Sequence, residues 1–592
     1  MNITYKNQSL ERILIFVNAF TATVVVASFV LLFGFDEPLF RAWILYSVQV
    51  ALLCVFVGEK LIRMFNAVSK AEFWRANWFE IPLLLALGIA VVGAGRWFAP
   101  TKPEATEVRH FAVGLYLVVK VVAKLCKTSV NLAASGRSPT RTLIASFLVL
   151  IFSGAGLLML PAAAADGKES LSFVDALFTA TSGTCVTGLI VKDTGKDFSI
   201  MGQVVILALI QLGGLGIVVF GAVFALLLGQ AFSLRESVAM QDLLSARTVS
   251  RIGNMIGFVF FSTILIEAVG AVSLLGMWTG DVQNKWFCSI FHAISAFCNA
   301  GFSLFSNSFV DYNRSWQACA VICPLIILGG LGFSVLYDLV NIAVDRIRRF
   351  FKRSFYKQYK FQMVAPKRMR LQTKIVLSVS ASLIVLGTLA ILLFERFAAG
   401  AGSQPENTIT GAIFQSITSR TAGFNTVDIS AMSPSSKFIL ILLMFVGGSP
   451  GSTAGGIKTV TLAVIIMAAV AALRKRHEVE MFRRSVRIVV VGRAVTVTLL
   501  FAAVLFGGTL LLSITENSNG FTMSDIMFEA ASALGTVGLT TGITSMLTTA
   551  GKVIIIAMML IGRLGPLTLL AALTFNLKPG RYNYPQEAVI VG

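Results

Sequence analysis

The chain has 592 residues, of which 56% are hydrophobic and 13% are charged. Soluble globular proteins carry about 25% charged residues, so this composition and a mean hydropathy of +0.81 exclude an ordinary soluble domain and indicate a membrane protein. The net charge of +20 is concentrated in a few connections between apolar stretches. That pattern is typical of cytoplasmic loops and argues against nucleic-acid binding. The cysteine spacings fit neither a disulfide framework nor a zinc site.

Twelve stretches are apolar enough and long enough to cross a bilayer, which takes about 20 residues. They are residues 12–34, 43–65, 78–98, 109–130, 142–163, 203–229, 252–278, 318–343, 373–394, 436–473, 489–513 and 552–575. The stretch 436–473 is too long for one simple span, and we expect the proline and glycines of Gly447–Lys458 to break it. An even number of spans places both termini on one side, and the basic residues near them predict that this side is the cytoplasm.

Four short segments between these spans share one pattern: a phenylalanine, residues rich in Ser, Thr and Ala, and a glycine followed by Leu or Phe. They are FTATSGTCVTGL (178–189), FHAISAFCNAGF (291–302), FQSITSRTAGF (414–424) and FEAASALGTVGL (528–539). Their glycines are 113, 122 and 115 residues apart, and such a period indicates repeated structural units. Each segment is too polar to span the membrane and too apolar for an ordinary loop. We therefore expect four re-entrant hairpins, each a short helix followed by a glycine turn.

The four glycine turns predict a ring of backbone carbonyls around one pore. Such rings replace the hydration shell of potassium, and turning successive carbonyls inward requires backbone angles that glycine tolerates. The predicted lining residues are Cys185, Val186, Thr187, Gly188, Cys298, Asn299, Ala300, Gly301, Arg420, Thr421, Ala422, Gly423, Gly535, Thr536, Val537 and Gly538. The alternative is that these glycines serve helix packing. Four of them with matched flanks favour the pore.

The interrupted segment follows the third glycine turn and is the candidate gate. Its residues are Gly447, Gly448, Ser449, Pro450, Gly451, Ser452, Thr453, Ala454, Gly455, Gly456 and Lys458. We expect a flexible obstruction under the carbonyl ring, with Lys458 as a movable positive charge. Arg563 lies in the last apolar stretch, where an arginine is costly and marks a functional-site candidate. We expect it to face the pore as an electrostatic barrier; the alternative is an arginine that snorkels at a helix end.

These motifs resemble the Trk/Ktr/HKT superfamily of potassium transporters. The glycine turns resemble its selectivity-filter loops, GGSPGSTAGGIKT (447–459) resembles its intramembrane loop, and IGRLGPLTL (561–569) resembles its last helix with a pore-facing arginine. The resemblance covers roughly residues 140–577. It implies an all-α polytopic membrane protein with four pseudo-repeats around one pore, a potassium ion in the filter, rubidium as its analogue, and no covalently bound cofactor. It also implies a homodimer and a cytosolic nucleotide-binding ring, so nucleotide would act only through that partner.

The sequence therefore predicts three parts. Residues 1–138 form an N-terminal four-helix membrane region, and residues 579–592 form a short cytoplasmic tail. Between them, the pore domain 139–578 contains repeats at about 139–235, 245–345, 370–475 and 485–578. The N-terminal region loosely resembles a voltage sensor, but only His110 stands between Arg109 and Lys120 where further gating charges would be needed. A structural or regulatory helical bundle is favoured.

The predicted function is potassium uptake across the cytoplasmic membrane of a prokaryote, with basic connections that contact a partner or anionic lipids. Gly188 favours potassium because some members of the superfamily have serine there and conduct sodium. The alternatives are a sodium- or proton-coupled symporter and a less selective monovalent cation channel. An ion-coupled transporter of a small solute would show inverted repeats and several broken helices, whereas here the repeats share one orientation and only one stretch is strongly broken. No catalytic cluster suggests an enzyme.

Overall fold

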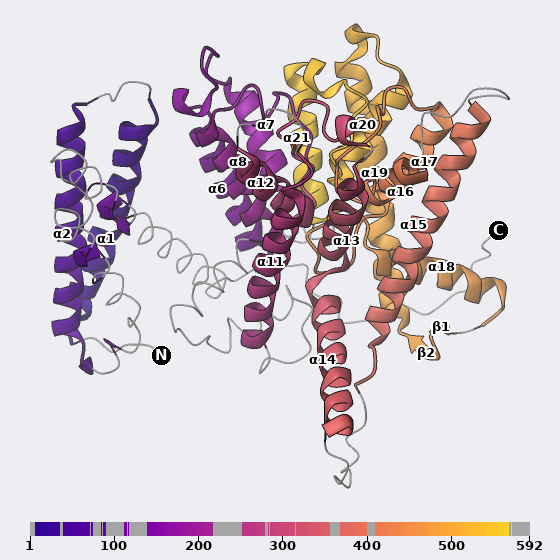
Figure 1. Cartoon of the computed structure of the whole chain (residues 1–592), viewed down its shortest axis with the longest axis horizontal. Helices are drawn as coiled ribbons and strands as arrows, with labels where there is room; N and C mark the ends of the chain where they lie inside the picture. The colour runs from indigo at the N-terminus through magenta and orange to yellow at the C-terminus, as the bar shows by residue number, and fades with distance from the viewer. Residues whose placement is uncertain are drawn as a thin grey trace, which may run out of the picture.

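The computed structural model is an all-helical membrane protein with one small hairpin of strands (Figure 1). It describes residues 6–35, 40–70, 139–216, 252–278, 284–313, 315–355, 367–398, 409–476 and 478–566, with a few single residues or short runs at 73–117, 282 and 570. The predicted turns, the interrupted segment and Arg563 all lie in this part of the chain. The predicted tail 579–592 lies outside it.

The helices fall into an N-terminal pair and four groups. The pair is α1 (Gln8–Phe33) and α2 (Ala42–Asn66). The first two groups are α6 (Pro139–Leu158), α7 (Phe173–Thr184) and α8 (Ile200–Leu215), then α11 (Ile252–Leu274), α12 (Lys285–Phe297), α13 (Cys323–Leu331) and α14 (Phe333–Phe355). The last two are α15 (Leu371–Ala398), α16 (Ile409–Thr418), α17 (Pro434–Phe445) and α18 (Thr459–Leu473), then α19 (Ile488–Thr515), α20 (Met523–Gly535) and α21 (Thr549–Leu564).

The long helices identify an integral membrane protein. In the described part of the chain, α1, α2, α15, α19 and residues 253–274 of α11 are long and apolar enough to cross a bilayer. Ten of the twelve predicted spans coincide wholly or in part with helices. The other two, 78–98 and 109–130, lie mostly outside the described residues, so the four-helix N-terminal region stays a prediction.

The stretch 318–343, predicted as one span, is bent. A π-helical turn and α13 lead to Gly332, after which α14 departs at 104°. Gly332 has a φ of +85°, and a Cβ there would lie 2.7 Å from the Ser449 hydroxyl oxygen and 2.9 Å from the Pro450 carbonyl oxygen. The prediction of a single strongly broken stretch is therefore wrong. The segment Gly447–Lys458, which forms the predicted break between α17 and α18, packs into this second break.

The four groups form a closed ring. In each group a short helix (α7, α12, α16 or α20, hereafter the pore helices) follows a long helix, as predicted for re-entrant hairpins. The helix that comes next packs against the pore helix of the neighbouring group: α8 against α12, α13 against α16, α17 against α20, and α21 against α7. Because the last contact returns to the first group, the four units surround a common axis.

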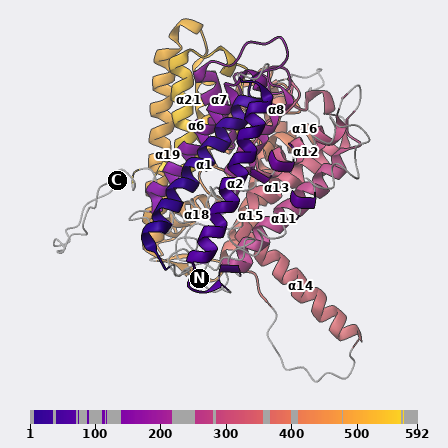
Figure 2. The same ribbon diagram turned by 90° about the vertical axis from the view of Figure 1, so that its left-hand side faces the viewer.

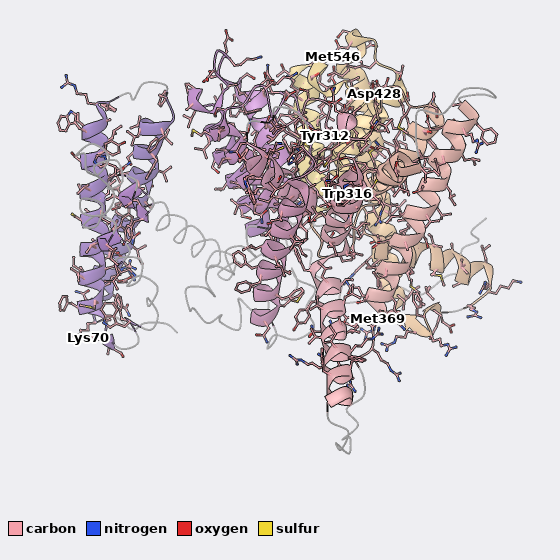
Figure 3. All side chains as sticks on the ribbon, viewed as in Figure 1. Lys70, Tyr312, Trp316, Met369, Asp428 and Met546 are labelled. Atoms are coloured by element: carbon pink, nitrogen blue, oxygen red, sulfur yellow. The ribbon has the colours of Figure 1, made fainter. Side chains whose placement is uncertain are left out.

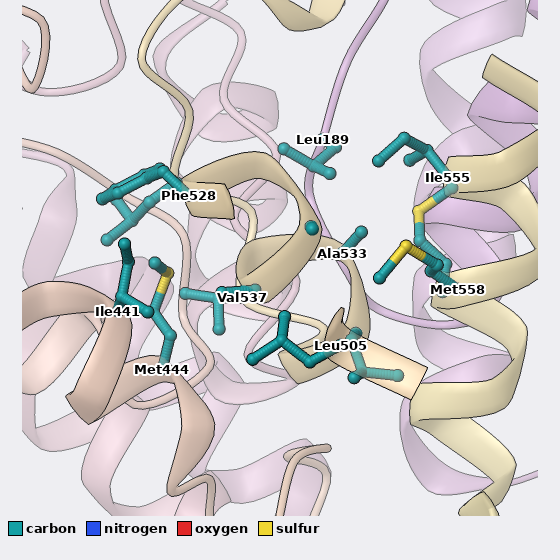
Figure 4. Close-up of a cluster of buried hydrophobic side chains, with 14 of the residues drawn as sticks. Leu189, Ile441, Met444, Leu505, Phe528, Ala533, Val537, Ile555 and Met558 are labelled. Atoms are coloured by element: carbon teal, nitrogen blue, oxygen red, sulfur yellow. The ribbon is translucent and has the colours of Figure 1, made fainter. Parts of the chain in front are cut away.

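Buried phenylalanines anchor the pore helices in this ring. Each is at most 1% exposed: Phe178, Phe291, Phe414 and Phe528. Figure 4 shows how Ile441 and Met444 of α17 lie beside Phe528 of α20 in one buried cluster. Burial of one such aromatic side chain stabilises the fold by about 1.5–3 kcal/mol. The repeated phenylalanine of the sequence pattern is thus a packing residue.

Two pore helices begin at a capping residue and carry an ion pair in their first turn. Ser172 and Thr522 cap α7 and α20 by accepting hydrogen bonds from the N–H groups of Asp175 and Asp525. Lys552 of α21 pairs with Asp175 at 2.7 Å, and a lysine of α17 pairs with Asp525 at 3.8 Å. Acidic residues in the first turn also complement the helix dipole. These ion pairs join neighbouring units of the ring.

The N-terminal pair lies at one side of the ring (Figures 1 and 2). Asn7 and Asn66 hold its two ends together, because the Asn7 N–H donates to Asn66 Oδ1 at 2.9 Å and Asn66 Nδ2 donates to the Asn7 carbonyl at 3.0 Å. At the other end of α1, the Ala162 N–H donates to the Gly34 carbonyl at 3.2 Å. This bond links the pair to the first group.

The molecule has two different faces. Asp428 and Met546 lie at one end and Lys70 and Met369 at the other (Figure 3). The second end carries the projecting basic end of α14 and a hairpin of β1 (Val479–Met481) and β2 (Arg484–Val486), paired antiparallel. We call it the basic face. The hairpin is absent from the all-helical prediction, and it occupies the predicted basic connection between the third and fourth groups.

Candidate ion pathway

Each pore helix runs directly into one of the predicted glycine turns, residues 185–188, 298–301, 420–423 and 535–538. Every turn contains two residues with left-handed backbone, separated by one position. Their φ values are +57° and +89° at Val186 and Gly188, +59° and +70° at Asn299 and Gly301, +75° and +84° at Thr421 and Gly423, and +51° and +94° at Thr536 and Gly538. This conformation is unfavourable for β-branched residues. Its recurrence at one register therefore indicates that the surroundings impose it.

The N–H groups of the turns fold back onto the pore helices. Hydrogen bonds to helix carbonyls run from Thr187 to Ser182 (2.8 Å), Ala300 to Ser295 (2.7 Å), Ala422 to Thr418 (2.8 Å) and Val537 to Ser532 (2.8 Å). Within the described residues, no hydrogen bond ends on a carbonyl oxygen of the last three residues of any turn. Buried carbonyls normally find a partner, so these oxygens are available to coordinate a cation.

The four glycines meet in a ring. A Cβ on each glycine would overlap a carbonyl oxygen of the next turn: Ala300 for Gly188, Ala422 for Gly301, Val537 for Gly423 and Thr187 for Gly538. The fourth contact returns to the first turn, so the chain brings all four predicted turns together around one axis. Only glycine fits where a backbone carbonyl approaches this closely.

Buried hydroxyl groups of the pore helices also bind the turns, a role that we did not predict. Ser182 and Ser532 accept from the N–H groups of Gly188 and Gly538, both at 3.1 Å. In the other two units, Ser295 and Thr418 donate to the carbonyls of Phe302 (2.9 Å) and Phe424 (2.7 Å). The Ser/Thr-rich part of each segment could have predicted these hydrogen bonds, because a hydroxyl residue recurs five or six residues before each glycine.

In three of the four turns, the first residue belongs to the end of its pore helix, whereas Arg420 lies two residues beyond the end of α16. Cys185 and Cys298 are the C-caps of α7 and α12, with φ of −78° and −71°, and Gly535 is the last residue of α20. The Arg420 guanidinium reaches the Ser380 hydroxyl on α15 at 3.3 Å. It also donates to the carbonyl of Gly447 at 3.4 Å. Of these four residues, Arg420 thus links its turn to α15 and to the interrupted segment.

The interrupted segment Gly447–Lys458 lies where the pore helices end. The Thr453 hydroxyl donates to the Phe297 carbonyl at the end of α12 at 3.3 Å. A Cβ on Gly455 would overlap the hydroxyl of Thr536 in the fourth turn. The segment therefore contacts two units that face each other across the ring.

The Lys458 ammonium group is held by the segment itself. It donates to the carbonyls of Ala454 at 2.7 Å and Gly455 at 3.1 Å. Multiple hydrogen bonds to backbone carbonyls offset part of the cost of placing this charge in the membrane. Lys458 therefore joins the end of the interrupted segment back to Ala454 and Gly455.

Arg563 joins the interrupted segment to the first unit. Its guanidinium donates to the Thr453 carbonyl and to the carbonyls of Gly213 and Gly214 at the end of α8. The other units have glycine at the position of Arg563: Gly214, Gly330 and Gly448. Arg563 therefore contacts backbone carbonyls inside the ring, which disagrees with an arginine that snorkels to a helix end.

Replacing Arg563 with glutamine is expected to raise basal cation flux. Each hydrogen bond to a charged group contributes about 1.5–3 kcal/mol, and each 1.4 kcal/mol is about a tenfold change in an equilibrium constant. Loss of the link to Thr453 should therefore raise the open fraction about tenfold or more. Flux of rubidium into liposomes measures this. Arg563→Lys keeps the charge without the fork of donors, and equal loss of folded protein in both variants would instead indicate a structural role.

The long helices, the four pore helices and the ring of glycine turns together define an integral membrane protein with four units around one axis. A family model described as TrkH, cation transport protein, matches residues 107–583. The chain therefore belongs to this family of cation transport proteins, which confirms the resemblance drawn from the motifs, and it is not an enzyme. In the described residues no group of three or more His, Cys, Asp or Glu could hold a metal ion.

Known proteins similar to this chain carry related descriptions. It is 38% identical to the Ktr system potassium uptake protein B of Bacillus subtilis, over 77% of this chain and 97% of that protein. It is 34% identical to the potassium/sodium uptake protein NtpJ of Enterococcus hirae, with the same two coverages. The crystal structure of the potassium transporter TrkH from Vibrio parahaemolyticus has a similar fold, with a TM-score of 0.56 at 19% identity over 84% of this chain and 96% of that one. The family match begins at residue 107, so most of the predicted N-terminal region 1–138 precedes it.

Proposed function

We propose that this chain takes up potassium across the cytoplasmic membrane through the ring of glycine turns, which acts as its selectivity filter. The observation that carries the proposal is the closed ring in which each glycine lies against a carbonyl of the next turn. The N–H groups of the turns donate to the pore helices. The carbonyl oxygens of the turns are then left to replace the hydration water of a dehydrated cation. The relatives described as potassium uptake proteins support potassium as the ion.

The interrupted segment Gly447–Lys458 is proposed as the gate of this pathway. It contacts the second and fourth units next to the filter, and Arg563 ties it to the first unit. A positive charge there disfavours a cation in the pathway, by roughly 4 kcal/mol at 4 Å for an effective dielectric constant of 20. Movement of the segment away from the filter then opens the pathway.

The proposed topology places the basic face in the cytoplasm, with both termini there. Residues 1–138 are an accessory membrane region, and the four repeats of residues 139–578 form the pore. The basic end of α14 and the basic residues around β1 and β2 are proposed contacts for a cytosolic nucleotide-binding ring or for anionic lipids, where each Lys or Arg near the surface contributes about 1 kcal/mol. The working unit is proposed to be a homodimer.

A sodium-coupled symporter or a less selective cation channel is the second candidate. The observation in its favour is the similarity to a protein described as a potassium/sodium uptake protein. The two candidates share the same pathway and differ in which ions pass and in whether sodium drives potassium.

Ion flux into liposomes containing the purified full-length chain separates these functions. We expect potassium and rubidium to enter, and sodium and lithium to enter at least about tenfold more slowly, a difference of about 1.4 kcal/mol in barrier height. Similar rates for all four ions would indicate the less selective channel. Potassium entry that accelerates with an inward sodium gradient would indicate symport.

A further inference from the structure

We propose that His292 and Glu529 are positioning residues that fix the second and fourth glycine turns from behind and thereby set the cation selectivity. The inference rests on the proposed function of these turns as a filter. Both residues directly follow the repeated phenylalanine of their pore helix. Both bind the chain that leaves the turn on its far side, residues 302–304 and 539–544, which we call the trailing loops.

Glu529 binds the fourth trailing loop through both carboxylate oxygens. It is 1% exposed. Oε1 accepts from the Thr541 N–H at 3.2 Å and from the Thr540 hydroxyl, and Oε2 accepts from the Thr544 hydroxyl at 2.9 Å. An ionised carboxylate only accepts hydrogen bonds, so these three donors match its chemistry. Glu529 thereby fastens the trailing loop to the middle of α20.

His292 binds the second trailing loop in the same way. The Leu304 N–H, which can only donate, reaches His292 Nε2 at 3.3 Å, and Nδ1 lies 2.8 Å from the Cys288 carbonyl, which can only accept. These partners assign the neutral ring with hydrogen on Nδ1. The Ser303 hydroxyl also reaches Nε2 at 3.1 Å. The side chain is fully buried, so the bond is shielded from water.

Glu529 and His292, which we call the anchors, occupy equivalent positions in their units. Each lies nine residues before its glycine, and each binds the second and third residues after that glycine. The glycine turn is thus enclosed between its pore helix and a hydrogen-bonded trailing loop. Because units two and four face each other across the ring, the anchors hold opposite sides of the filter.

The first and third units lack this anchor. Thr179, nine residues before Gly188, donates to the Asp175 carbonyl of its own helix at 2.9 Å. The third segment has one residue fewer before its glycine, and both amide ends of Gln415 are buried without a hydrogen-bond partner. After that turn, Asn425 binds the second unit instead: its N–H donates to the Ser308 hydroxyl at 3.3 Å, and its carbonyl accepts from the Phe309 N–H at 3.0 Å. These units provide internal controls.

Loss of an anchor should loosen the turn without removing its carbonyls. A buried N–H and hydroxyls lose their acceptor, which frees the trailing loop. The carbonyls of the turn then adapt more easily to a smaller cation, so sodium competes better and potassium binds less tightly. The expected signature is a combined change in apparent affinity and in ion preference, which a merely structural role would not produce in folded protein.

The test uses the full-length chain in liposomes, with rubidium as the probe. In Glu529→Ala and His292→Ala, we expect the rubidium concentration for half-maximal uptake to rise about tenfold and the rubidium-to-sodium flux ratio to fall about tenfold. Glu529→Gln and His292→Gln each keep an acceptor and should stay within about twofold of the unsubstituted protein in both measurements. Thr179→Ala and Gln415→Ala are the matched controls and should change neither value.

Unchanged values in folded Glu529→Ala and His292→Ala would overturn the inference, as would Gln variants that behave like the Ala variants. If the Ala variants do not fold, Thr540→Val and Thr544→Val remove the donors from the loop side, and unchanged selectivity in both would be equally decisive. Gly538→Ser in the same assay tests the filter itself. If Gly538→Ser alters the flux ratio but the anchors do not, the proposed function stands and only this inference fails.

Discussion

Replacing Gly188 with serine is expected to lower the potassium-to-sodium permeability ratio. Gly188 has a φ of +89°, and its Cβ would overlap the Ala300 carbonyl oxygen in the neighbouring turn. A side chain there therefore strains its own backbone and displaces the adjacent carbonyl. Strain of about 1–3 kcal/mol corresponds to about a five- to 150-fold change in an equilibrium. We expect a loss of selectivity in this range, measured as the ratio of potassium to sodium flux into liposomes.

Gly301→Ser is expected to act in the same direction, because its Cβ would lie 2.7 Å from the Ala422 carbonyl oxygen. Gly167→Ser is the matched control. Gly167 also has a left-handed φ, +76°, but a Cβ there has open space. It therefore reports the cost of backbone strain without a displaced carbonyl. If both filter variants accumulate normally and keep the original flux ratio, the assignment of the filter is wrong.

The sequence was sufficient to predict the parts of the pathway that repeat. The period of the glycine segments predicts four pore helices and four turns, because units that share one sequence pattern are expected to share one local structure. The break before Thr459 was also predictable, since Pro450 and its neighbouring glycines cannot continue a helix in the bilayer. These signals are local, and the helices and turns appear where the local pattern places them.

Long-range contacts explain what the sequence did not reveal. The bend at Gly332 depends on the packing of Ser449 and Pro450 from another unit, and Gly332 has no local feature that distinguishes it from other glycines at helix ends. The sequence likewise did not reveal that the Arg420 guanidinium reaches Ser380 on α15. The place of Arg420 among the lining residues stays a prediction. The sequence analysis singled out no role for Glu529, because its partners lie 11 to 15 residues away and come close only after the chain has passed through the turn.

The interrupted segment presents a natural pair of variants for the gate. Gly455 lies against the fourth turn, where a Cβ would overlap the Thr536 hydroxyl, whereas a Cβ on Gly451 meets open space. Gly455→Ala is therefore expected to push the segment away from the filter and raise basal potassium flux. Gly451→Ala adds the same methyl group at a left-handed glycine of the same segment and should leave flux within about twofold of the original.

Deleting Gly451 to Gly456 is expected to have the larger effect. The deletion removes Thr453, and with it the hydrogen bonds to the Phe297 carbonyl and from Arg563. Loss of two such bonds, at about 1 kcal/mol or more each, should raise the open fraction at least about tenfold. Basal rubidium flux into liposomes, without any regulator, measures this. Combining the deletion with Arg563→Gln should add little, because both act on the same contact. A fall in flux at normal protein levels would show that the segment supports the filter, and the gate proposal would then be abandoned.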